Sequence, residues 1–189
     1  MLAIIGLGNP GEKYDHTRHN AGFDVVTMLS ALWDIPLKKL KCKALIGEGT
    51  AEGQKIVLIK PQTFMNESGL SVAEVLNWFK LRPQEVLIIV DDIDLPFGQV
   101  RVRSGGGPGT HNGMRSILQC TGSADFPRIR VGMGAPPAGW EVWPMLSVAW
   151  RGPQSASSFR VQRSKPQASA GSWRLNGGSG GRNTRCIPP

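Results

Sequence analysis

His19 lies in a polar segment between a short apolar run and an apolar-periodic stretch. A histidine titrates near neutral pH, so it can take a proton from water as a general base. A carboxylate that accepts a hydrogen bond from the other ring nitrogen would fix the tautomer of the histidine and stabilise the imidazolium. Asp91 directly follows the apolar run 86–90, and the end of a strand is a good place for such a carboxylate. Without such a partner, His19 would be an ordinary loop histidine.

Three asparagines, Asn9, Asn66 and Asn112, share one kind of position, at a boundary between a strand and a loop or between a loop and a helix. Caps and turns explain single asparagines. An amide both donates and accepts hydrogen bonds, as a peptide backbone does. Three amides in equivalent positions therefore suggest a pocket that reads an amide-containing ligand.

Other chemistries fit the sequence less well. His16 and His19 could bind a metal with acids from 91–94, but an acidic run after a strand is more commonly a solvated turn. We expect no metal and no cofactor. The pattern Gly-x-Gly-x-x-Gly at 6–11 matches a dinucleotide fingerprint, yet Pro10 and the polar run after it delay the next helix to about residue 20. A Gly-x-Ser-x-Gly nucleophile motif is absent, so water is the better nucleophile.

Strands that alternate with helices must position these residues. Apolar runs and alternation predict strands at 2–7, 42–50, 55–60, 85–90, 99–103 and 128–133. Helical spacing predicts helices at 20–33, 68–79 and 112–120. In the second helix we expect one apolar face, formed by Leu70, Ala73, Leu76 and Phe79. A hairpin in the middle of the chain makes the expected fold a single α/β domain with a mixed β-sheet.

Composition is that of a globular protein, with 40% hydrophobic and 19% charged residues among 189. We expect no membrane span and no signal peptide, because no long apolar run is present. The cysteines are three and widely spaced, at 42, 120 and 186. This favours free thiols and a cytoplasmic location.

The net charge of +8 lies mainly in the last part of the chain. Residues 135–189 contain seven of the 22 Lys and Arg residues but only Glu141 of the 14 acids. They also contain four of the six Trp and show no helical or strand period. We predict a catalytic domain at 1–142 and a disordered tail at 143–189.

Several motifs together resemble bacterial-type peptidyl-tRNA hydrolase, in that family's order and spacing. They are 6–11 with Tyr14, 17–22, 60–69, 91–98, the glycine-rich loop that ends at 111–113, 126–132 and 136–137. The resemblance covers residues 1 to about 142. It implies hydrolysis of the ester that joins a peptide to the terminal ribose of tRNA.

The resemblance also implies roles for single residues. His19 would activate water, and Asp91 would orient and polarise His19. The peptide part and the scissile carbonyl would be held by Asn9, Met65, Asn66 and Asn112, with an Asn amide stabilising the oxyanion. Tyr14 would border the site near the tRNA end. Arg101, Arg103 and Arg130 would face phosphates of the tRNA acceptor end. The enzyme would be a cytoplasmic monomer that needs no metal.

After about Val142 the resemblance ends, where the family continues with an amphipathic stretch and a long charged helix. A Trp/Ser/Arg/Gly/Pro-rich tail almost without acids is typical of out-of-frame translation of a GC-rich gene, and a frameshift is our hypothesis for it. The alternative is a genuine basic tail that adds RNA affinity. The altered end also leaves open the alternative that the chain is a noncatalytic, RNA-binding relative with the same fold.

Overall fold

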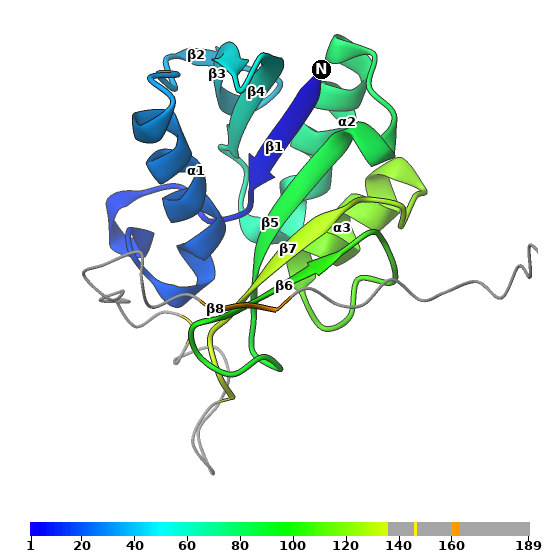
Figure 1. Ribbon diagram of the computed structural model, residues 1–189. Coiled ribbons are helices and arrows are strands. Elements are labelled where there is room, and N and C mark those ends of the chain that lie inside the picture. Colours follow the sequence, from blue (N-terminus) through cyan, green and yellow to red (C-terminus); the bar gives the residue numbers. More distant parts are fainter. Residues whose placement is uncertain (136–145, 147–159, 163–189) are drawn as a thin grey trace, which may run out of the picture.

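The computed structural model describes residues 1–135, Leu146 and the backbone of 160–162, and its strands form one mixed sheet (Figure 1). The strand order is β2-β3-β4-β1-β5-β7-β6-β8. The strands are β1 Leu2–Gly6, β2 Lys39–Lys41, β3 Ala44–Ala51, β4 Gln54–Pro61, β5 Val86–Asp92, β6 Gln99–Arg103, β7 Arg128–Gly132 and β8 Arg160–Gln162. The central strands β4, β1, β5 and β7 are parallel, whereas β2–β3–β4 and β6–β7 pair antiparallel. The predicted mixed α/β fold is confirmed.

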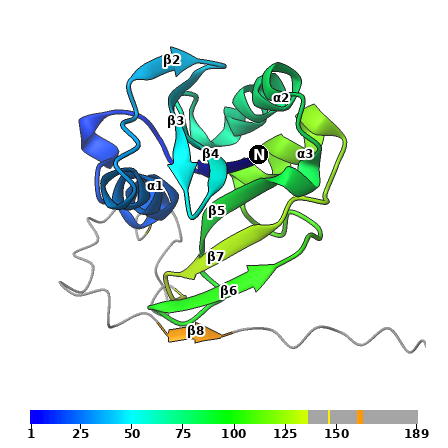
Figure 2. The same ribbon diagram turned by 45° about the horizontal axis from the view of Figure 1, so that its top comes forward.

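Helices cover both faces of the sheet (Figures 1 and 2). They are α1 Ala21–Leu32, α2 Ser68–Phe79 and α3 Asn112–Thr121. On one face, Val26 of α1 packs in a core with Ile4 and Ile89 of the sheet. On the other face, residues of α2 and α3 share a second core with β1 and β5. No helix among the described residues is long and apolar enough to cross a membrane.

The carboxyl ends of β1 and β4 are a switch point of the sheet. These two strands are parallel neighbours, but the chain leaves β1 for α1 on one face and leaves β4 for α2 on the other. Open α/β sheets bind ligands at such points, because the diverging loops expose the strand ends. The first polar segment of the sequence and the loop after β4 meet here.

The structure differs from the sequence predictions at three places. The strand β2 was not predicted, because its three residues are all exposed and show no apolar pattern. The predicted apolar face of α2 is correct only in part. Leu76 and Phe79 pack against the core, but Leu70 is 42% exposed while Val72 and Val75 are fully buried. The region predicted as a disordered tail includes the short strand β8, which pairs with β6. Its other residues except Leu146 lie outside the described part of the chain.

Gly22 brings the start of α1 into direct contact with the sheet. A Cβ added at Gly22 would lie 2.5 Å from the carbonyl oxygens of Ile89 and Leu7. No side chain fits at that distance, so the helix can approach β1 and β5 this closely only with glycine at this position. His19 precedes Gly22 by three residues. The contact therefore helps to hold His19 against β5.

We expect Gly22→Ala to lower the free energy of unfolding by about 1–3 kcal/mol, as overpacking of a close contact does. Urea denaturation at an unchanged m-value would measure this effect. Gly107→Ala is the matched control, because an added Cβ there meets nothing within 4 Å. Equal midpoints for the two variants would contradict the close-approach explanation.

Candidate active site

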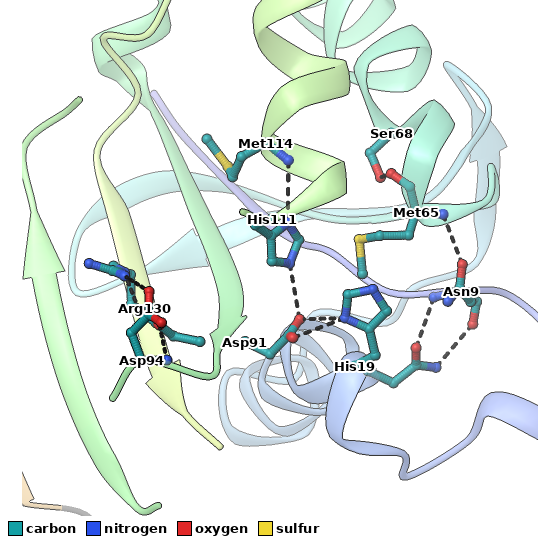
Figure 3. A network of polar contacts seen from close by, with 11 residues as sticks. Asn9, His19, Met65, Ser68, Asp91, Asp94, His111, Met114 and Arg130 are labelled. Atoms are coloured by element: carbon teal, nitrogen blue, oxygen red, sulfur yellow. Dashed lines mark hydrogen bonds and ion pairs between the residues drawn. The ribbon is translucent and has the colours of Figure 1, made fainter. Parts of the chain in front are cut away.

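His19 and Asp91 form the centre of the site (Figure 3). His19 lies in a short 3-10 helix, Arg18–Asn20, that leads into α1, and Asp91 lies near the end of β5. The Nδ1 atom of His19 is 2.9 Å from both carboxylate oxygens of Asp91. Both residues are buried. The structure thus brings together the histidine and the carboxylate that the sequence singled out.

His111 is a second histidine on the same carboxylate, and no role is predicted for it from the sequence. Its Nε2 atom lies 3.0 Å from Oδ1 of Asp91. Its Nδ1 atom accepts a hydrogen bond from the backbone N–H of Met114, so His111 caps the N-terminus of α3. Because Nδ1 accepts, the ring proton of neutral His111 is on Nε2, which donates it to Asp91. The signals for His111 in the sequence are its position just before the third predicted helix and its place in the glycine-rich motif that ends at 111–113.

The charge of Asp91 follows from these two contacts. Burial alone would raise the pKa of the carboxyl, but the positive charge of His111 when it is protonated, and the hydrogen bonds from His111 and His19, outweigh it. The net effect lowers the pKa well below the ordinary value. Asp91 is therefore an anion that accepts hydrogen bonds, and His19 donates through Nδ1. The proton-accepting nitrogen of neutral His19 is then Nε2.

Asn9 is held in place by contacts on both sides. Its side-chain oxygen accepts from the backbone N–H of Met65 at 2.8 Å. Asn20, fully buried, receives a hydrogen bond from the backbone N–H of Asn9 at 2.8 Å and donates to its carbonyl at 3.0 Å. Because Oδ1 of Asn9 accepts from Met65, the amide N–H groups are directed to the other side. Asn20 was missed as a site residue, although it follows His19 directly in the sequence.

The remaining residues expected to bind the peptide part lie at different depths. Met65 is buried, and its side chain points toward His19 (Figure 3). Asn66 and Asn112 are exposed, at the 3-10 helix after β4 and at the start of α3. Tyr14 is half-buried and packs edge-on against Phe64, with 6.4 Å between the two ring centroids. Asn9 and Met65 are thus preorganised, whereas the side chains of Asn66 and Asn112 are exposed to solvent.

A cavity of about 570 Å³ extends from His19 along the glycine-rich loop. Asp91, His111 and Asn112 line one part of it, and arginines line another. The antiparallel register pairs Arg101 with Arg130 and Arg103 with Arg128, which puts all four on one face of the sheet. Arg103 and Arg130 line the cavity, but Arg101 does not.

The charge of Arg130 is largely neutralised by two acids. Its Nε atom forms an ion pair with Asp92, and its Nη2 atom lies 3.9 Å from Asp94. Arg103 is exposed and Arg101 is half-buried. Arg103 is thus the best placed of the three predicted basic residues to meet an anionic ligand at the cavity.

The cluster of His19, Asp91 and His111 is the group of described residues that could hold a metal ion, with ligand atoms within 4.8 Å of one another. Both imidazoles already donate N–H groups to Asp91. A metal ion would have to replace these hydrogen bonds, so the two arrangements exclude each other. The expectation that the site needs no metal stays a prediction.

Comparisons with known proteins cover the region that contains this site. The family model described as peptidyl-tRNA hydrolase matches residues 3–146. A peptidyl-tRNA hydrolase of Brevibacillus brevis is 52% identical over 142 residues, 75% of each chain. That of Alkaliphilus oremlandii is 52% identical over 139 residues. A crystal structure of the Acinetobacter baumannii peptidyl-tRNA hydrolase matches with a TM-score of 0.75 and 38% identity, over 79% of this chain and 76% of that one.

Proposed function

The chain belongs to the peptidyl-tRNA hydrolase family, and we propose that His19 is the base with which it hydrolyses the ester between peptide and tRNA. The observation that carries the proposal is the contact of 2.9 Å between His19 Nδ1 and Asp91. With Nδ1 donating to the carboxylate, Nε2 can accept a proton. General-base histidines are oriented in this way.

The reaction follows from that proton transfer. Nε2 of His19 takes a proton from water as the water oxygen bonds to the ester carbon. The tetrahedral intermediate then collapses, the bond to the ribose oxygen breaks, and the imidazolium returns the proton to that oxygen. The products are a peptide with a free carboxylic acid, which loses its proton to solvent, and a tRNA with a free hydroxyl group. Asp91 stabilises the imidazolium during this sequence without taking the proton itself.

Asn9 supports the oxyanion of the intermediate. Its Oδ1 atom is already engaged by Met65, so its amide N–H groups are the ones available for a substrate oxygen. The exposed amides of Asn66 and Asn112 can exchange hydrogen bonds with the peptide backbone, and Met65 offers it an apolar wall. A preorganised amide stabilises developing negative charge better than water does, because it need not reorient.

We expect Asn9→Asp to lower kcat/KM for peptidyl-tRNA by about 10²-fold, the usual cost of losing one oxyanion donor. Aspartate keeps the oxygen that accepts from Met65 but replaces the donating NH2 with a negative oxygen. The release of free tRNA from labelled peptidyl-tRNA would measure the effect. Asn77→Asp, on the exposed side of α2, is the matched control. Unchanged kcat/KM in Asn9→Asp would exclude the donor role.

The tRNA acceptor end binds to the arginine face, by which we mean Arg101, Arg103 and Arg130 on one face of β6 and β7. Exposed Arg103 and half-buried Arg101 can contact phosphates, while Arg130 also holds Asp92. Such contacts give affinity for many tRNAs without reading bases. A cytoplasmic location and a monomeric state complete the proposal. The release of tRNA by the whole 189-residue chain is the direct test, since a noncatalytic relative would bind tRNA without releasing it.

A further inference from the structure

Arg128 is a buried arginine whose hydrogen bonds all go to backbone carbonyls. It begins β7 and is 5% exposed. Its Nη1 atom donates to Gly107 at 2.9 Å, and its Nη2 atom donates to Gly106 at 2.6 Å and to Ala124 at 3.2 Å. Its Nε atom donates to Phe126 at 3.4 Å. Within residues 1–135, no carboxylate forms an ion pair with it.

These contacts matter because the glycine-rich loop has few other means of fixing its position. An added Cβ at Gly106, Gly107 or Gly109 would meet nothing within 4 Å, so this stretch does not pack closely against the rest of the protein. Gly106 and Gly109 have φ of 125° and 59°, which few other residues adopt. The loop therefore depends on hydrogen bonds to its backbone.

The loop is held by side chains at three points along its length, and the backbone N–H of Gly106 also donates to the carbonyl of Ala124 at 3.1 Å. Arg128 holds the carbonyls of Gly106 and Gly107 at its start, and Arg115 Nε donates to Gly109 at 3.2 Å in its middle. At its end, His111 binds Asp91. Only the first of these anchors is a buried guanidinium, whose planar fork can serve several carbonyls at once.

We propose that Arg128 is a positioning residue, which fixes the glycine-rich loop so that His111 and Asn112 stay in place beside Asp91. This rests on the proposed function, because it assumes that the His19–Asp91 pair performs the reaction. Arg128 acts through the loop and does not touch the substrate. A small displacement of the loop would loosen the contact of His111 with Asp91 and move the amide of Asn112.

The main alternative is that Arg128 binds a substrate phosphate. Arg128 also lines the cavity, beside Arg103 and Arg130. Its guanidinium nitrogens already donate to four carbonyls, however, so a phosphate would have to compete with the loop for them. The two roles predict different kinetics. Loss of a phosphate contact raises KM and depends on charge, whereas loss of positioning lowers kcat.

The test compares Arg128→Lys, which keeps the charge without the fork, with Arg128→Gln, which loses both. We expect both variants to lower kcat at least about 10-fold, with KM for peptidyl-tRNA within about 3-fold of the parent value, because misplacement of catalytic groups acts on the chemical step. Amide hydrogen exchange in 104–111 should accelerate about 10-fold in both, with β1 and β5 unchanged. Arg101→Gln, which replaces an arginine of the same face, should leave exchange in the loop unchanged.

Two results would overturn the proposal. Unchanged loop exchange in Arg128→Gln would show that the guanidinium does not hold the loop. A raised KM in Arg128→Gln, with parent-like kcat in Arg128→Lys, would identify a phosphate contact instead. The exchange measurement needs no turnover, so failure of the proposed catalytic roles would not be confused with failure of this inference.

Discussion

Replacing His19 by alanine is expected to lower kcat for peptidyl-tRNA hydrolysis by about 10³-fold, within the range for loss of a general base. Water would have to attack without proton transfer to Nε2, and Asp91 would lose the imidazolium that it stabilises. Affinity for tRNA should change little, because the proposed phosphate contacts come from Arg101, Arg103 and Arg130 and not from His19. Release of free tRNA under single turnover measures the first effect, and filter binding measures the second.

His16→Ala is the matched control for this experiment. His16 is a loop histidine of the same segment, its side chain is 77% exposed, and its carboxylate partner is Asp24 at 3.3 Å. Its removal should leave kcat within about 2-fold of the parent, as surface changes away from a site usually do. Full turnover in His19→Ala would exclude His19 as the base, and an equal loss in His16→Ala would show that the effect is not specific.

The buried strands and the pairing of His19 with Asp91 could be predicted from the sequence, because burial leaves a strong pattern. β1 and β5 are covered on both faces, so each appears as a continuous apolar run, and Asp91 ends one of these runs. The helix 68–79 and the strand 99–103 have the predicted bounds. Polar residues at the ends of parallel strands meet at one edge of a sheet. This is why His19 and Asp91 could be paired before their distance was known.

The buried face of α2 could not be predicted because close packing uses small residues. Ser68, Gly69 and Ser71 are buried, and a Cβ added at Gly69 would lie 2.1 Å from the carbonyl oxygen of Ser116 on α3. Hydrophobicity alone would place Leu70 on the buried face of the helix, but its side chain points outward. The role of Arg128 was hidden for a similar reason, since its partners are carbonyl groups that every residue possesses.

His111 shows a different limit of sequence reasoning. Its partner Asp91 is 20 residues away, and its tautomer depends on the backbone N–H of Met114. Neither relation leaves a pattern in residue types. The structure therefore adds to the predicted pair a second histidine on the same carboxylate, and this has a consequence for any substitution of Asp91.

Asp91→Asn is expected to lower kcat by about 10³- to 10⁴-fold, because it would place the proton of His19 on the wrong nitrogen. Asparagine offers one accepting oxygen and one donating NH2 group. Nε2 of His111 must donate, since its Nδ1 accepts from Met114, so the amide oxygen would turn to His111. The NH2 group would then donate to Nδ1 of His19. That leaves the proton on Nε2, which can no longer accept one from water.

Nitrogen NMR of the His19 ring would report the tautomer directly, and single-turnover release of tRNA would report kcat. Asp94→Asn is the control, because that carboxylate is 70% exposed and lies 3.9 Å from Arg130. We expect it to keep parent-like kcat. A fully active Asp91→Asn enzyme, or one with an unchanged His19 tautomer, would contradict the explanation.

The double variant Asp91→Asn/His111→Asn separates the tautomer from the lost charge. Asparagine at 111 can still cap α3 but no longer has an imidazole N–H for the amide oxygen at 91. That oxygen is then able to accept from Nδ1 of His19, so we expect about 10-fold recovery of kcat over the single variant, with the remainder due to the missing carboxylate. No recovery would mean that the negative charge of Asp91, or the loop anchor that is lost with His111, accounts for the loss and not the hydrogen-bond direction.

The difference in stability between the parent protein and the Asp91→Asn variant should depend on pH in a defined direction. The folded state lowers the pKa of Asp91, so the ionised carboxyl stabilises the fold above its ordinary pKa of 3.8. This contribution is lost as pH falls from there through the folded value. The difference in free energy of unfolding between parent and Asp91→Asn should therefore be constant near neutral pH and shrink below about pH 4. A difference that grows in acid would mean that the two histidines do not hold Asp91 as an anion.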